Sequence, residues 1–128
     1  LGLYRRLGEI KSLLELEAFE EEAYDRFGTI PKAMKQLLYM VYLKILCLQA
    51  SVEKLDIGVK GMTISFYQNT FPNVEGLLTY IQKNFLLYHI QSDQKIIYKK
   101  SLENTSCQYE EAVSVLETLS ALAQKVSG

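Results

Sequence analysis

A sharp corner between two helices, at residues 22–31, constrains the fold of this chain most strongly. Gly28 follows a helical pattern, and glycine can adopt the positive φ that ends a helix at little cost. Pro31 comes three residues later and suits the start of a helix, where its missing N–H would have had no partner. Glu22 and Asp25 stand just before the stop. The segment therefore predicts two helices joined by a tight turn with acidic side chains beside it.

Two helical patterns flank this corner. Before it, Ser12 and Glu15 make a capping-box pattern for a helix over about residues 13–26, whose apolar stripe continues to Phe27. After it, apolar residues at three- and four-residue steps predict a long helix over about residues 31–50. The density of apolar side chains in the second helix indicates the central and most buried helix of the fold.

The period of the apolar pattern changes after the long helix. Residues 52–57 and 62–67 are short β-like runs, and Gly58-Val59-Lys60-Gly61 separates them as a hairpin turn would. Residues 74–83 return to a helical pattern. This part of the chain therefore predicts a β-hairpin followed by a helix.

The last third of the chain predicts another hairpin and a final helix. A second hairpin is expected from residues 86–91 and 95–100, across Ser92-Asp93-Gln94. Thr105 with Gln108 is a capping-box candidate for a final amphipathic helix. The whole order predicts an α+β fold with N-terminal helices, two antiparallel β-hairpins separated by a helix, and a C-terminal helix.

Length and composition fit one globular domain. The 128 residues can bury one core, and 48% hydrophobic with 23% charged residues is ordinary for a folded protein. We expect a single domain over residues 1–128, with a helical part at 1–50 and a hairpin-and-helix part at 51–128. The chain begins Leu-Gly-Leu without methionine, so we expect a piece of a larger protein. No apolar run approaches the roughly 20 residues of a membrane span, which favours a cytoplasmic protein without a membrane partner.

Patterns for catalysis or cofactor binding are missing from the sequence. The glycines do not form a phosphate-binding loop, and one histidine with two cysteines is too little for a typical metal shell. His89 lies in a β-like run, where an ordinary strand histidine is favoured over a catalytic base. A nucleophile pair of Cys47 or Cys107 with His89 is the weaker alternative. We therefore expect neither an enzyme nor a bound metal or cofactor.

The acidic turn has two interpretations. Glu22 and Asp25 are three residues apart and share a helix face near the helix C-terminus, where the dipole disfavours negative charge by about 0.3–1 kcal/mol. In one interpretation Arg26 offsets this charge within the turn. In the other, the carboxylates await an arginine on another surface, which would pair with them in bidentate fashion.

The second hairpin offers an alternative function. Lysines alternate there with aromatic residues, and such a surface can stack bases and neutralise phosphates; the residues are Tyr88, Lys95, Tyr98, Lys99 and Lys100. The chain would then be a nucleic-acid-contacting accessory module that uses the hairpin at 95–100. The same alternation is also typical of a half-buried antiparallel strand.

Four segments, in order along the chain, resemble a known family. They are Leu3-Tyr4-Arg5-Arg6-Leu7, then Glu22-x-x-Asp25-Arg26-Phe27-Gly28-x-x-Pro31, then the helix that contains Leu37 and Leu38, and last Val52-Glu53-Lys54-Leu55-Asp56 before Lys60-Gly61. Over roughly residues 2–83 the sequence resembles the C-terminal domain of bacterial transcription-repair coupling factors.

The resemblance implies a regulatory role within a larger protein. The parent would be an ATP-driven DNA translocase, with ATP and Mg in its motor, that displaces stalled RNA polymerase in transcription-coupled nucleotide-excision repair. This chain would be its non-catalytic, autoinhibitory C-terminal domain, which packs on a UvrB-like module, masks the binding of UvrA and restrains the motor. RNA polymerase and DNA would be bound by other domains of the parent.

The resemblance also assigns roles to residues of the corner. Glu22 and Asp25 match the acidic positions of the family's turn, and the resemblance implies that they bind the UvrB-like module through its arginines. The residues that match the same signature and are expected to fix the corner are Arg26, Phe27, Gly28 and Pro31.

Overall fold

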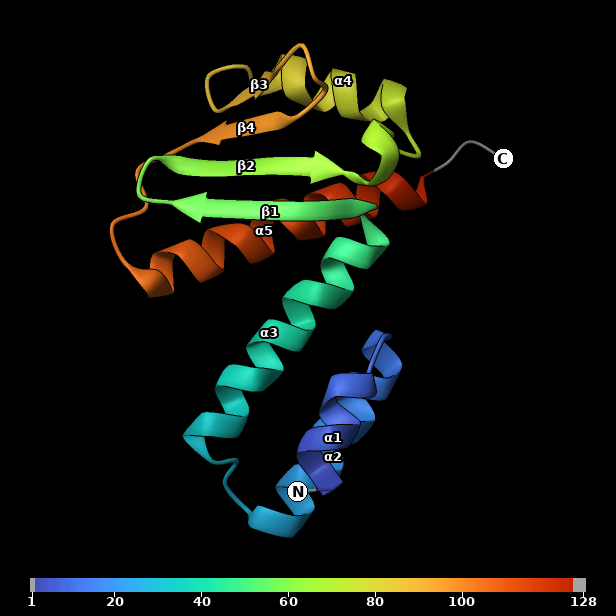
Figure 1. Cartoon of the computed structure of the whole chain (residues 1–128), viewed down its shortest axis with the longest axis vertical. Helices are drawn as coiled ribbons and strands as arrows, with labels where there is room; N and C mark the ends of the chain where they lie inside the picture. The colour runs from blue at the N-terminus through green and yellow to red at the C-terminus, as the bar shows by residue number, and fades with distance from the viewer. Residues whose placement is uncertain (1, 126–128) are drawn as a thin grey trace. The chain divides into compact units, whose positions relative to one another are not determined.

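The computed structural model describes residues 2–125, which form two compact units (Figure 1). Of the described residues, the first unit comprises 2–45 and the second comprises 46–125. The boundary falls inside one helix, so that helix contributes side chains to both units. Among the described residues, no helix combines the length and apolar character that crossing a membrane would require.

The first unit contains helices α1 (Gly2–Glu9), α2 (Leu13–Phe27) and most of α3 (Lys32–Gln49). Ser12 caps α2 as predicted: its hydroxyl accepts the Glu15 N–H at 3.2 Å and donates to the Glu15 carboxylate at 3.1 Å. The core is one cluster of buried apolar side chains: Leu7, Ile10, Leu16, Phe19, Ala23, Met34, Leu38 and Ile45.

The corner ends α2 through Gly28. Its φ is 71°, and its N–H donates to the carbonyl oxygen of Tyr24 at 2.7 Å. Helix α3 then starts after Pro31, whose carbonyl oxygen accepts the Lys35 N–H at 3.0 Å. Phe27 is 47% exposed, so the prediction that the apolar stripe of α2 reaches this residue was wrong. The buried part of the stripe stops at Ala23.

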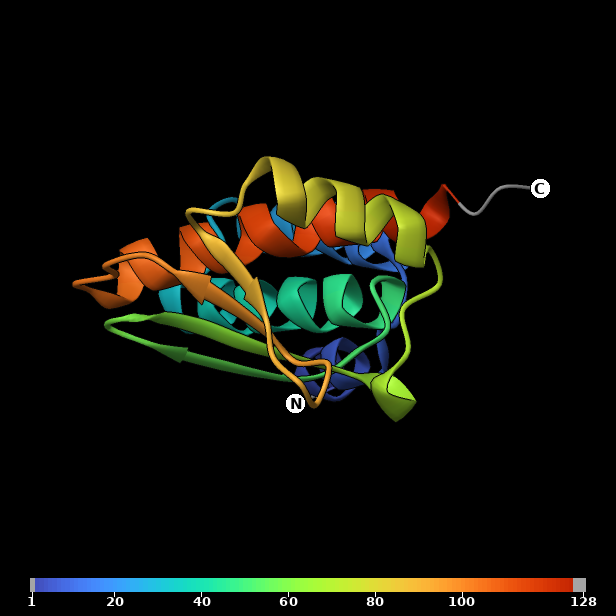
Figure 2. The same ribbon diagram turned by 90° about the horizontal axis from the view of Figure 1, so that it is seen from above.

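The second unit is built on one antiparallel sheet of β1 (Val52–Gly58), β2 (Gly61–Phe66), β3 (Tyr88–Ile90) and β4 (Ile96–Lys99). The strand order is β1-β2-β4-β3, so the two predicted hairpins join through β2 and β4. A short 3-10 turn, η1 (Tyr67–Asn69), follows β2. Helices α4 (Val74–Lys83) and α5 (Thr105–Gln124) lie side by side on one face of the sheet (Figures 1 and 2). The predicted α+β class and element order are confirmed.

Helix α5, rather than α3, is the most buried helix. It contributes six buried residues to the core of the second unit: Ala112, Val115, Leu116, Leu119, Ser120 and Ala123. Helix α3 instead leaves Leu37, Met40 and Leu48 between 41% and 64% exposed. The sequence prediction was wrong because α3 is divided between two units, whereas α5 lies against the sheet of one unit.

Two predicted boundaries also shift. Strand β3 begins at Tyr88 instead of residue 86, because the Asn84 carbonyl accepts the N–H groups of both Leu87 and Tyr88 and forms a turn there. The cap of α5 is Asn104 instead of Thr105, and its side-chain oxygen accepts the Cys107 N–H at 2.8 Å. Asparagine is the stronger capping residue of the two, which explains why the helix starts one residue earlier than predicted.

Candidate functional site

The two acidic residues of the corner have different surroundings. Glu22 forms an ion pair with Arg6 of α1: Arg6 Nη1 lies 2.7 Å from Glu22 Oε2, and the two side chains are 53% and 40% exposed. The Arg6 guanidinium carbon lies 5.6 Å from the centre of the Phe19 ring, within the range of a cation–π contact. Glu22 is therefore a partly exposed carboxylate that already holds a cation from a neighbouring helix.

Asp25 faces open solvent. It is exposed and lines a shallow hollow of about 430 Å³ together with Glu20, Glu21, Tyr24 and Ile30. Tyr24 is 64% exposed there. Among the residues that the structure describes, Asp25 makes no ion pair. The hollow thus combines carboxylates with an accessible aromatic ring, a combination that suits an arginine or lysine side chain.

The local interpretation of the turn named the wrong arginine. Arg26 is exposed and pairs with neither carboxylate within residues 2–125, whereas Arg6 binds Glu22. Spacing along α2 suggested Arg26 as the neighbour, but a contact between two helices cannot be read from spacing within one of them. In the sequence, the sign of a cation near Glu22 was the pair of arginines in the Leu3–Leu7 segment, which was used only for the family resemblance.

The four residues expected to fix the corner divide into two pairs. Gly28 and Pro31 act through the backbone, as the positive φ and the first hydrogen bond of α3 show. The side chains of Arg26 and Phe27 are exposed. Gly28 and Pro31 thus account for the bend through the backbone, and the expected role of Arg26 and Phe27 in the corner stays a prediction.

The lysine and tyrosine hairpin does not offer its tyrosines for base stacking. Tyr88 and Tyr98 are only 6% and 5% exposed, and their ring centres lie 4.9 Å apart. The Tyr98 hydroxyl donates to Glu111 Oε2 at 2.7 Å, and Lys100 Nζ donates to Glu111 Oε1 at the same distance. This surface therefore lacks the stacking platform that the nucleic-acid alternative requires, and the side chains serve to join β4 to α5.

The contacts of Glu111 predict that the stability of the second unit depends on pH. The hydrogen bond from Lys100, followed by that from Tyr98, lowers the pKa of the Glu111 carboxyl below its ordinary value of 4.5. A group whose pKa is lower in the folded state stabilises that state above its unfolded pKa, and the stabilisation is lost as the pH falls through the folded value. Glu111→Gln should therefore reduce the acid dependence of stability, seen as a smaller loss of urea midpoint between pH ~7 and pH ~3.

The neighbouring acid provides a matched control for this prediction. Glu110 is exposed, belongs to the same turn of α5 and has no ion pair among the described residues. Glu110→Gln should leave the acid dependence as it is in the unchanged chain. Equal acid dependence in both variants would show that the contacts to Glu111 contribute nothing to folding.

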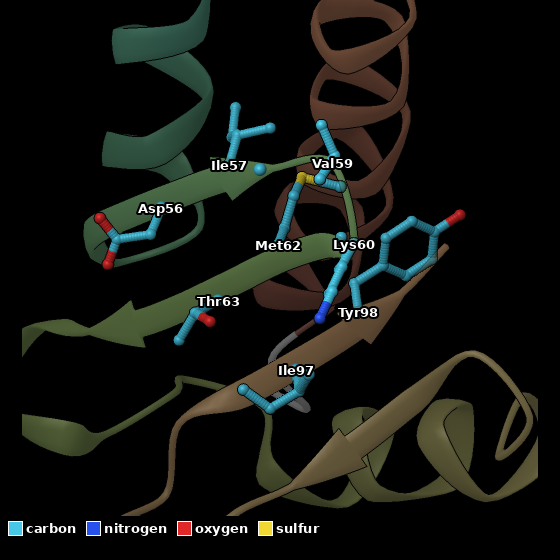
Figure 3. A pocket seen from close by; sticks show the side chains of 10 residues that line it. Asp56, Ile57, Val59, Lys60, Met62, Thr63, Ile97 and Tyr98 are labelled. Atoms are coloured by element: carbon cyan, nitrogen blue, oxygen red, sulfur yellow. The ribbon is translucent and has the colours of Figure 1, made fainter. Parts of the chain in front are cut away.

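A second hollow, of about 450 Å³, lies at the β1–β2 turn (Figure 3). Tyr98 and Met62 point toward α5, whereas Asp56 and Thr63 lie on the other side of the sheet. Asp56 and Lys60 are the charged residues of its lining, which includes neither histidine nor cysteine.

His89 and Cys47 have the surroundings of ordinary residues rather than of catalytic ones. His89 is exposed and pairs across the sheet with Ile97, as an ordinary strand residue does. Burial raises the pKa of the Cys47 thiol, which opposes formation of a thiolate. Within residues 2–125, no cluster of three or more histidine, cysteine or acidic side chains could hold a metal ion.

Fold and surface together define an α+β domain with a helical unit that presents an acidic turn. The family model of the TRCF domain matches residues 1–77, which include the corner and the β1–β2 hairpin. The chain therefore belongs to the TRCF domain family. The resemblance predicted from the residues around the corner is confirmed.

Curated relatives carry the name transcription-repair-coupling factor. A protein from Rickettsia bellii is 37% identical over 102 residues, which cover 80% of this chain and 9% of the relative. The protein from Haemophilus influenzae is 31% identical over 121 residues, which cover 94% of this chain and 11% of the relative. The Escherichia coli protein is 26% identical over 110 residues, which cover 86% of this chain and 10% of the relative. The chain spans about a tenth of the length of these relatives.

The fold has a counterpart among solved structures. The chain is similar to the crystal structure of the C-terminal domain of a transcription-repair coupling factor, with a TM-score of 0.70. The match covers 97% of this chain and 80% of that chain at 16% sequence identity. Both the helical unit and the sheet unit thus have equivalents in that domain.

Proposed function

We propose that this chain is the non-catalytic regulatory domain of a transcription-repair coupling factor and that it acts by autoinhibition. In the parent protein, the acidic turn binds arginines of the UvrB-like module. That contact masks the surface for UvrA and restrains the ATP-driven translocase that displaces stalled RNA polymerase. DNA, RNA polymerase, ATP and Mg are bound by other parts of the parent, in the cytoplasm.

The observation that carries this proposal is the open carboxylate of Asp25 in its hollow, on a chain of the TRCF domain family. A negative charge at the C-terminal end of a helix costs up to about 1 kcal/mol unless a cation offsets it. Glu22 has Arg6, but Asp25 has no cation among the described residues. A guanidinium group from a partner would supply the missing charge and could form two parallel hydrogen bonds with the carboxylate.

The mechanism is a shift between two populations of the parent. A closed form, in which the acidic turn is bound, hides the UvrA surface, and an open form exposes it. The domain inhibits because it binds only the closed form, so the bound fraction sets the basal activity. Coupling of this kind is worth about 1–3 kcal/mol, or roughly 5- to 150-fold in an equilibrium constant.

Reversing both charges tests the proposal in the full-length parent. Glu22→Arg with Asp25→Arg should raise basal ATP hydrolysis and tighten UvrA binding roughly tenfold, because two repelling cations replace two attractive contacts. The Glu22 side chain is 40% exposed and Asp25 is exposed, so the helical unit should stay folded.

The matched control reverses two exposed acids of the same unit outside the turn. Glu9→Arg with Glu17→Arg changes the net charge by the same amount and should leave both readouts unchanged. Equal increases in the two double variants would mean that net charge, and not the turn, controls the parent. No change in the turn variant would exclude these two residues as the contact.

A further inference from the structure

The ion pair of Arg6 with Glu22 places a cation of this chain on one of the two proposed contact carboxylates. Arg6 Nη1 and Glu22 Oε2 are 2.7 Å apart, yet more than a third of each side chain remains exposed. A partner can therefore reach Glu22, but it meets a carboxylate that is already occupied. Asp25 carries no such internal partner within residues 2–125.

The ring of Phe19 holds Arg6 in this position. The guanidinium carbon lies 5.6 Å from the ring centre, and Phe19 is itself 1% exposed and fixed in the core. Because the guanidinium is already positioned over the ring, it loses less side-chain freedom on pairing with a carboxylate than the guanidinium of a freely moving arginine would. At this exposure such a pair shifts an equilibrium by a small factor and remains easy to displace.

We propose that Arg6 competes with the partner's cation for Glu22 and thereby sets how tightly the acidic turn holds the closed form. This inference rests on the function proposed above and adds to it a residue of α1, outside the turn. In the closed form a guanidinium of the partner binds Glu22, and Arg6 stays over Phe19. In the open form Glu22 returns to Arg6, which stabilises that form. Arg6 is a positioning residue that acts only through Glu22.

Arg6→Gln in the full-length parent tests the competition. Basal ATP hydrolysis should fall roughly twofold to fivefold, because Glu22 without its internal partner holds the closed form more tightly. Arg6→Lys keeps the positive charge but loses the planar guanidinium group. The ATP hydrolysis of this variant should therefore lie between that of the unchanged parent and that of Arg6→Gln. Arg5→Gln is the matched control: it removes the same charge from the same exposed turn of α1 and should leave hydrolysis unchanged.

A second background separates competition from a change in packing. In a parent that carries Glu22→Gln, Arg6→Gln should have no further effect, because its target is gone. A fall in hydrolysis that persists in this background overturns the inference, and so does a rise in hydrolysis in the single Arg6→Gln variant. If reversal of both carboxylates changes nothing, the proposed function fails; if only Arg6→Gln changes nothing, the competition alone fails.

Discussion

Replacing Gly61 with alanine is expected to cost the sheet unit roughly 3 kcal/mol or more of folding free energy. Gly61 has a φ of +138°, which side-chain-bearing residues rarely adopt, and it pairs with both Gly58 and Lys99 in the sheet. A Cβ atom at this position would run into the backbone carbonyl oxygen of Tyr98. Because that oxygen belongs to the neighbouring strand, the clash can be relieved only if β2 moves away from β4.

Urea unfolding followed by circular dichroism measures this loss, and Gly58→Ala is the control. Gly58 lies across the same turn, has no atom within 4 Å of an added Cβ, and does not have a positive φ. Its substitution should shift stability by no more than about 0.5 kcal/mol. Similar midpoints for the two variants would mean that β2 and β4 do not approach each other at Gly61 as described.

Phe19→Ala is the second substitution with a large expected effect, a loss of about 3–5 kcal/mol in the helical unit. Phe19 is 1% exposed and is among the largest fully buried side chains of the described residues. The first unit has one small cluster of buried side chains, so a cavity of this size removes a large part of its core. The thermal unfolding of α1, α2 and the first part of α3 should move to a lower temperature.

Phe27→Ala supplies the comparison on the same helix. Phe27 is 47% exposed, and its truncation should cost about 1 kcal/mol or less because little buried surface is lost. Equal losses for the two phenylalanines would contradict the placement of the core. A large loss at Phe27 alone would instead support its expected role in fixing the corner.

Local signals predicted most of the fold. The Ser12 cap, the stop at Gly28 and the turn between Gly58 and Gly61 each depend on residues within a few positions of one another. Such features follow from backbone conformation and short-range hydrogen bonds, which sequence spacing reports directly. The cap of α5 shows the limit of this approach, since Thr105 was predicted from its spacing to Gln108 and the observed cap is Asn104.

Long-range contacts could not be predicted in the same way. The pairing of β2 with β4 joins the two hairpins, and no feature within either hairpin specifies it. The alternation of lysine and tyrosine was typical of a half-buried strand, but it did not show that Tyr98 lies on the buried side. The Arg6–Glu22 pair likewise connects two helices whose relative rotation depends on packing. The family resemblance identified the acidic turn but gave no information about its internal partner.

The central claim is that the acidic turn keeps the parent closed, and the affinity of UvrA for the full-length parent tests it most directly. Three proteins are compared: the unchanged parent, the Glu22→Arg and Asp25→Arg variant, and a parent that lacks residues 1–128. The variant should bind UvrA roughly tenfold more tightly than the unchanged parent does, and nearly as tightly as the parent without the domain. The proposal would be contradicted if the parent without the domain bound UvrA tightly while the doubly reversed variant bound UvrA only as weakly as the unchanged parent.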